Sequence, residues 1–192
     1  MWGDEMDYKM YQKARNLTWD ILIKERICEL PIDIVSLCQK MGIAVKYFEP
    51  TDNNDGMCII LNDRPVIYIK ESCTNQRKRF TVAHELGHIL LGHVGKYELV
   101  NREPSFNDNP IEQAANVFAS RLLAPACVLW GCRVKDADDI MTLCDISRQS
   151  AEYRMKRMEE LYKRGKFLTS SQERQVFEQF KNFILNHQRQ DN

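Results

Sequence analysis

Two histidines four residues apart in an apolar segment place the strongest constraint on how this chain folds. They belong to the run His84-Glu85-Leu86-Gly87-His88, inside the sequence RFTVAHELGHILLGH. Residues four apart lie on one face of an α-helix, one turn from each other. A polar pair, Thr74 and Asn75, precedes the segment and offers an N-cap. We therefore expect one buried helix over about residues 76–91, with both imidazoles on the same side.

This spacing is typical of a metal site. Two imidazoles one helical turn apart can reach a single ion, and the geometry suits zinc. The alternative is a pair of ordinary helix histidines, but a buried neutral pair without a partner is costly. From the 4 His and 14 Glu of this chain, an HExxH pattern arises by chance on the order of six times in a thousand. We therefore predict that His84 and His88 bind a metal.

Hydrolytic zinc sites have three protein ligands and a water, so a third ligand is needed. The metzincin pattern would place a histidine at position 94, which is Val94 here, and His93 is displaced by one. We predict His93 to be a helix-end or surface residue. The downstream carboxylates include Glu98, Glu103 and Asp108, in a predicted loop, and Glu112, near the start of a second amphipathic helix.

Glu112 has two possible roles. A rigid helix positions a ligand better than a loop does, which favours a metal ligand. However, with Asn109 as N-cap and Pro110 at the first helical position, Glu112 is also where a capping-box glutamate belongs. Position alone leaves the two interpretations equal. Asn116, one turn further on, either orients Glu112 from behind or hydrogen-bonds local backbone, and both alternatives stay open.

Two sequence blocks resemble the ImmA/IrrE family of metallopeptidases, which is related in site design to the gluzincins. The first is the Arg-Phe-Thr helix with HExxH over residues 79–88, and the second is EQAANVFASRLLAP over residues 112–125. The resemblance covers about residues 31–125 and continues more weakly at Ala151 and Arg154. It implies that His84, His88 and Glu112 bind Zn²⁺ and that Glu85 is catalytic.

The chemistry of such a site gives Glu85 its role. From its angle on the helix Glu85 cannot reach the metal, so we expect it to take the proton of an attacking water and pass it to the leaving amine. The family resemblance further implies a protein substrate, a helix-turn-helix transcriptional repressor, often encoded beside the peptidase on mobile or phage-derived DNA. Tyr97 and His93 are candidates for oxyanion stabilisation by proximity only.

The rest of the pattern predicts an α+β fold, with a zincin-like core and a small mixed or antiparallel sheet. Strands are expected at 43–48, 57–61 and 66–70, with a hairpin turn at 62–65. The strand 66–70 either presents a free edge to an extended substrate or is paired on both edges. Further helices are expected at 8–27, 31–41, 136–144, 147–163 and 172–186. We expect one domain over 1–126, with its core at about 25–126, and a helical extension over 127–192.

Charge is distributed unevenly along the chain. The net charge is zero, which excludes a global attraction to nucleic acid or membranes. Residues 147–166 nevertheless hold seven basic and three acidic residues, in a segment resembling a helix-turn-helix. Phosphate contact and a solvated helix face both explain this. The first gives an alternative function, a non-catalytic regulator or DNA- or protein-binding module with a structural zinc site.

The N-terminus is charged from residue 4, and the longest apolar tract, residues 117–132, is shorter than a membrane span and interrupted by Arg121. The seven cysteines form no CxxC pair, so we expect free thiols. We therefore expect a cytoplasmic protein with no membrane partner.

Overall fold

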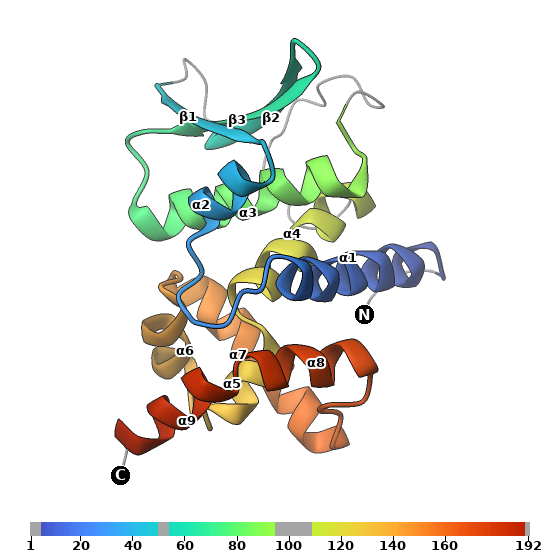
Figure 1. Cartoon of the computed structure of the whole chain (residues 1–192). Helices are drawn as coiled ribbons and strands as arrows, with labels where there is room; N and C mark the ends of the chain where they lie inside the picture. Colours follow the sequence, from blue (N-terminus) through green and yellow to red (C-terminus); the bar gives the residue numbers. More distant parts are fainter. Residues whose placement is uncertain (1–4, 50–53, 95–108, 191–192) are drawn as a thin grey trace. The chain divides into compact units, whose positions relative to one another are not determined.

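The computed structural model describes residues 5–49, 54–94 and 109–190 (Figure 1). The chain divides into two units, residues 1–15 with 33–119 and residues 16–32 with 120–192. The helices α1 (Glu5–Lys24) and α4 (Pro110–Leu123) each contribute residues to both units. The fold is α+β and the C-terminal region is helical, which confirms the predicted fold class.

The sheet of the first unit is mixed. It contains β1 (Ala44–Phe48), β2 (Gly56–Leu61) and β3 (Arg64–Lys70) in the order β1-β3-β2. β3 pairs parallel with β1 and antiparallel with β2. Of the two alternatives for residues 66–70, the strand paired on both edges is therefore correct.

The β2–β3 hairpin turns at Asn62 and Asp63, whose φ values are 50° and 59°. Asparagine and aspartate tolerate the left-handed region, which a two-residue hairpin turn of type I′ needs at both positions. The predicted turn at 62–65 is thus confirmed in a shorter form, because Arg64 and Pro65 already belong to β3.

Helix α3 (Asn75–Leu91) supports the sheet. Thr74 accepts a hydrogen bond from the Arg77 backbone N–H at its start, and Gly92, with φ 77°, ends it. α3 packs against β2 and β3, and α2 (Ile34–Lys40) packs against α3 and β1 (Figure 1). The helix predicted from residue 31 begins instead at Ile34, because the Asp33 side chain accepts from the Ser36 N–H and caps it.

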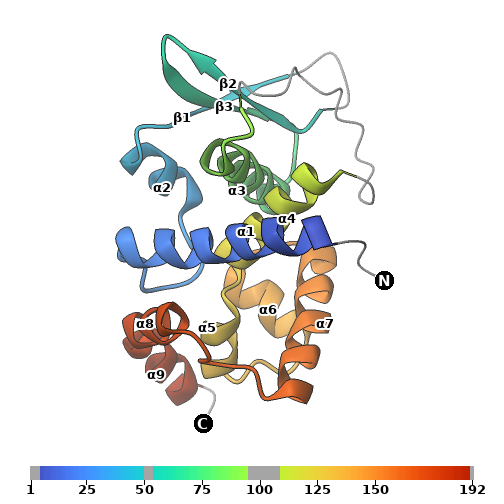
Figure 2. The ribbon, with the colours of Figure 1, turned by 90° about the vertical axis from the view of Figure 1, so that its right-hand side faces the viewer.

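The second unit is built from helices. They are α5 (Ala126–Gly131), α6 (Ala137–Cys144), α7 (Arg148–Arg164), α8 (Ser171–Gln179) and α9 (Lys181–Gln190). α6 packs beside α7 (Figure 2), joined by Asp145 in the left-handed region and by Ser147, which caps α7. These two helices correspond to the helices expected over 136–144 and 147–163. The helix expected over 172–186 is interrupted at Phe180, and α5 was not predicted.

Three of the seven basic residues in segment 147–166 have local partners. Arg148 pairs with Asp138 and Arg157 pairs with Glu160. Arg154 is buried, and its Nε donates to the carbonyl oxygen of Ala124 over 2.7 Å. These contacts favour a solvated, locally paired helix face over a continuous basic surface.

Among the described residues, one helical stretch, Pro110–Gly131, is long and apolar enough to cross a membrane by length and composition. In its most apolar window 78% is buried inside the structure, as is common for core helices. Length and composition alone are therefore weak evidence for a membrane span here.

Candidate metal centre

Three side chains from α3 and α4 converge on one point. The Nε2 atoms of His84 and His88 lie 3.0 Å apart. The Glu112 oxygens lie 3.1 Å from Nε2 of His84 and 3.3 Å from Nε2 of His88. All three potential ligand atoms lie within 4.8 Å of one another. The structure therefore brings together the three residues that the sequence predicted as ligands.

The approach of α4 to α3 depends on Gly87. A Cβ at this position would lie 3.0 Å from Cδ1 of Phe118 and 3.3 Å from Cα of Ala115. Because Gly87 lies between the two histidines on α3 and Ala115 follows Glu112 on α4, this contact sets the distance between the ligand atoms of the two helices. A larger side chain at 87 would have to displace the α4 backbone.

The centre is shielded from solvent to different degrees. The His88 side chain is 2% exposed, whereas those of His84 and Glu112 are 13% and 29% exposed. Burial raises the pKa of Glu112, but without a metal the hydrogen bonds that protonated His84 and His88 donate, together with their positive charge, outweigh burial and hold this pKa well below its usual value. The Glu112 carboxyl group is therefore ionised at neutral pH.

Asn116 orients His84. Its Oδ1 lies 2.9 Å from Nδ1 of His84. An amide oxygen only accepts, so Nδ1 of His84 carries a proton, and Nε2, which faces Glu112 and His88, is the nitrogen left to bind a metal. The sequence left open whether Asn116 supports Glu112 or binds local backbone, and this contact with His84 is neither.

His93 lies behind the other histidine. It follows the Gly92 cap at the end of α3, as predicted, but its Nδ1 is 3.1 Å from Nδ1 of His88. It does not belong to the group of ligand atoms around Glu112. The sequence pattern does not predict this contact, because residues five apart do not lie on one face of a helix, and His88 and His93 come close only through the turn at Gly92.

The predicted general base is buried in the same helix. Glu85 is 2% exposed and follows His84 directly. Burial of an acidic side chain next to a ligand is consistent with a role in proton transfer. Tyr97, Glu98, Glu103 and Asp108, considered above as oxyanion stabiliser or third ligand, lie outside the described residues.

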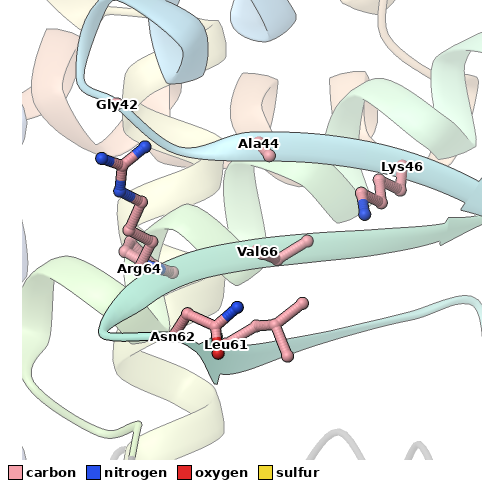
Figure 3. A pocket seen from close by; sticks show the side chains of 8 residues that line it. Gly42, Ala44, Lys46, Leu61, Asn62, Arg64 and Val66 are labelled. Carbon is pink, nitrogen blue, oxygen red and sulfur yellow. The ribbon is translucent and has the colours of Figure 1, made fainter.

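A separate hollow lies on the sheet (Figure 3). Its lining comes from β1, from the end of β2, from the β2–β3 turn and from β3, and includes Lys46, Leu61, Arg64 and Val66. The lining includes the cationic side chains of Lys46 and Arg64, but it contains no acidic side chain, no nucleophile and no set of metal ligands. The histidine cluster is therefore the better candidate for chemistry.

Fold and site together define a metallopeptidase-type domain: a helix with HExxH, a carboxylate from a following helix, and a small sheet. The family model of the IrrE N-terminal-like domain, Peptidase_M78, matches residues 38–156, more than half of the chain. The chain therefore belongs to this family, which confirms the resemblance stated above. No curated protein matches the chain.

Proposed function

We propose that this protein is a zinc-dependent metallopeptidase that cleaves a helix-turn-helix transcriptional repressor at a defined site. The convergence of His84, His88 and Glu112 supports the metal site. Tetrahedral zinc with nitrogen and oxygen ligands at about 2.0–2.2 Å requires ligand atoms roughly 3.3–3.5 Å apart. The two Nε2 atoms are 3.0 Å apart, Nε2 of His84 is 3.1 Å from Oε2 of Glu112, and Nε2 of His88 is 3.3 Å from Oε1, so the carboxylate lies close enough to both rings to meet this requirement. Two imidazoles and one carboxylate thus fit zinc and leave one position for water.

The residues divide the reaction between them. Zinc, when bound, supplies Lewis acidity that lowers the pKa of water and polarises a peptide carbonyl. Glu85 accepts the proton of the attacking water and then donates it to the amine that leaves when the C–N bond breaks. Asn116 holds the His84 ring so that Nε2 faces the site. The burial of Glu85 and His88 limits competition from bulk solvent.

The substrate class is supported by two features. Membership of the family supports a peptidase, and the resemblance to ImmA/IrrE peptidases supports a repressor as the target. In addition, β2 forms the end of the sheet order, and among the described residues β3 is its only strand partner. An extended peptide segment can add to such an edge through main-chain hydrogen bonds. A selective cytoplasmic protease of this kind would act on a loop or an unfolded segment.

The test is to incubate zinc-loaded protein with the repressor encoded nearest its gene and identify fragments by mass spectrometry. We expect one defined cleavage. The matched control is Glu85→Gln, which should bind zinc to the same stoichiometry and lose about 10²–10⁴-fold in rate.

Elemental analysis of both proteins checks the loading. Hydrolysis by zinc-loaded Glu85→Gln at the native rate would contradict the assignment of Glu85. Specific duplex binding by the zinc-loaded protein without any hydrolysis would instead support the alternative, a regulator with a structural zinc site.

A further inference from the structure

We propose that His93 is a positioning residue whose Nδ1 accepts a hydrogen bond from Nδ1–H of His88 and so keeps the Nε2 lone pair of His88 directed at the metal site. This inference rests on the proposed function, because it assumes that His88 is a metal ligand. It assigns a role to a histidine that is not part of the HExxH motif or of the group of ligand atoms.

The backbone turn after α3 places His93. Gly92 adopts φ 77°, and its N–H donates to the carbonyl oxygens of His88 and Ile89. The His93 N–H donates to the His88 carbonyl over 2.9 Å. The turn therefore returns the chain towards the last turn of α3, and the two rings meet with centroids 5.2 Å apart at 67°. This geometry is held by the backbone and does not depend on a bound ion.

The chemistry of the pair decides which nitrogen donates. Nδ1 of His88 and Nδ1 of His93 are 3.1 Å apart, so one must donate and the other accept. A neutral imidazole has one N–H, and a metal-binding nitrogen must have a lone pair. Nε2 of His88 faces His84 and Glu112, and for this nitrogen to bind a metal the proton of His88 must be on Nδ1. His93 is then the acceptor, with its own proton on Nε2.

The two ligand histidines are thus supported in parallel ways. His84 donates from Nδ1 to the amide oxygen of Asn116 on α4. His88 donates from Nδ1 to a ring nitrogen supplied by the turn that ends α3. Without an acceptor at residue 93, the 2% exposed His88 ring loses this partner for Nδ1–H, and the tautomer with the proton on Nε2 gains population. That tautomer cannot bind a metal through Nε2.

The experiment compares three variants. His93→Phe keeps a flat ring and removes the acceptor, whereas His93→Asn places an amide oxygen near the former Nδ1. His187→Phe is the matched control, because His187 lies in α9 of the second unit. Zinc affinity is measured by competition with a chromogenic chelator, and circular dichroism checks folding. We expect His93→Phe to weaken zinc binding about 10–100-fold, as loss of an outer hydrogen-bond partner does. His93→Asn should recover most of this loss, and His187→Phe should match the parent.

A second readout reports the hydrogen bond itself. In proton–nitrogen NMR spectra of the zinc-loaded protein, the Nδ1–H of His88 should give a downfield signal that exchanges slowly with water. It should persist in His93→Asn and broaden or disappear in His93→Phe. If the affinities of all variants equal that of the parent, or if the signal is unchanged in His93→Phe, the proposal is wrong. If the parent protein itself binds no zinc, the proposed function fails first, and the two failures are distinguishable.

Discussion

The starts of α4 and α8 have the same sequence pattern and different outcomes. Each helix follows a polar residue, Asn109 or Ser170, and each has a glutamate three positions later, Glu112 or Glu173. Glu173 turns back along its own chain, and its Oε2 accepts from the Thr169 backbone N–H over 2.9 Å. Glu112 instead places both oxygens against the histidines of α3.

The difference shows that the neighbouring helix determines the role of such a glutamate. Ser170 accepts from the Glu173 N–H, so cap and glutamate satisfy donors at one helix end, as in a capping box. At α4, Asn109 accepts from the Ile111 N–H, and the imidazoles of α3 attract the Glu112 carboxylate. The local sequence pattern is the same at both helices. Only Glu112 lies beside histidines from another helix, and these make it a candidate metal ligand.

The largest expected effect is the loss of Glu112. Glu112→Ala removes the anionic ligand, so zinc affinity should fall by more than the roughly 10–100-fold typical of outer-shell changes. A chelator competition assay measures this, with Glu173→Ala as the matched control. Equal zinc affinity in both variants would remove the distinction between the two glutamates.

Asn116→Leu should have the next largest effect. The variant is similar in size and removes the acceptor of the His84 Nδ1 proton, so zinc affinity should fall about 10–100-fold. The same titration measures it, and circular dichroism should show unchanged helix content. A parent-like affinity would mean that the contact between Asn116 and His84 does not support the ligand.

Glu173→Ala should lower stability without affecting the metal. Loss of a capping interaction costs about 0.5–2 kcal/mol, so the urea midpoint should decrease while zinc affinity stays at the parent value. Measuring the zinc-free protein separates the two effects. A weakened zinc affinity in this variant would indicate coupling between the two units.

The smallest effect is expected on the exposed end of α7. Lys163→Glu with Arg164→Glu should change stability by less than about 0.5 kcal/mol, because both side chains are exposed. Zinc affinity should not change. If the parent binds duplex DNA in a salt-dependent manner and the double variant does not, the basic segment has a role that its local ion pairs do not explain.

Sequence patterns predicted the elements whose signals are local. Thr74 was expected as a cap and is one. The helix expected over 147–163 is α7, which begins at Arg148 after its cap, Ser147. The turn at Asn62 and Asp63 follows from residues that tolerate positive φ. The sheet order did not follow, because the parallel pairing of β1 with β3 joins strands separated in sequence by β2. α5 was missed because its residues form a nearly continuous apolar run after Pro125, which has no helical period.

At the site, the spacing of His84 and His88 could be interpreted from sequence alone. Choosing Glu112 needed the family resemblance, because its position also fits a cap. The contact of Asn116 with His84 and the contact of His93 with His88 depend on how α4 and the turn at Gly92 approach α3. These contacts depend on tertiary packing, which the spacing of residues along the sequence does not specify.

Because residue 87 is a glycine, this position bears on the evolution and engineering of the domain. Gly87 packs directly against Ala115 and Phe118, so the distance between α3 and α4 depends on this contact. Adaptation to an ion of another radius would therefore begin by repacking this contact, and exchanging the donor atoms would come second.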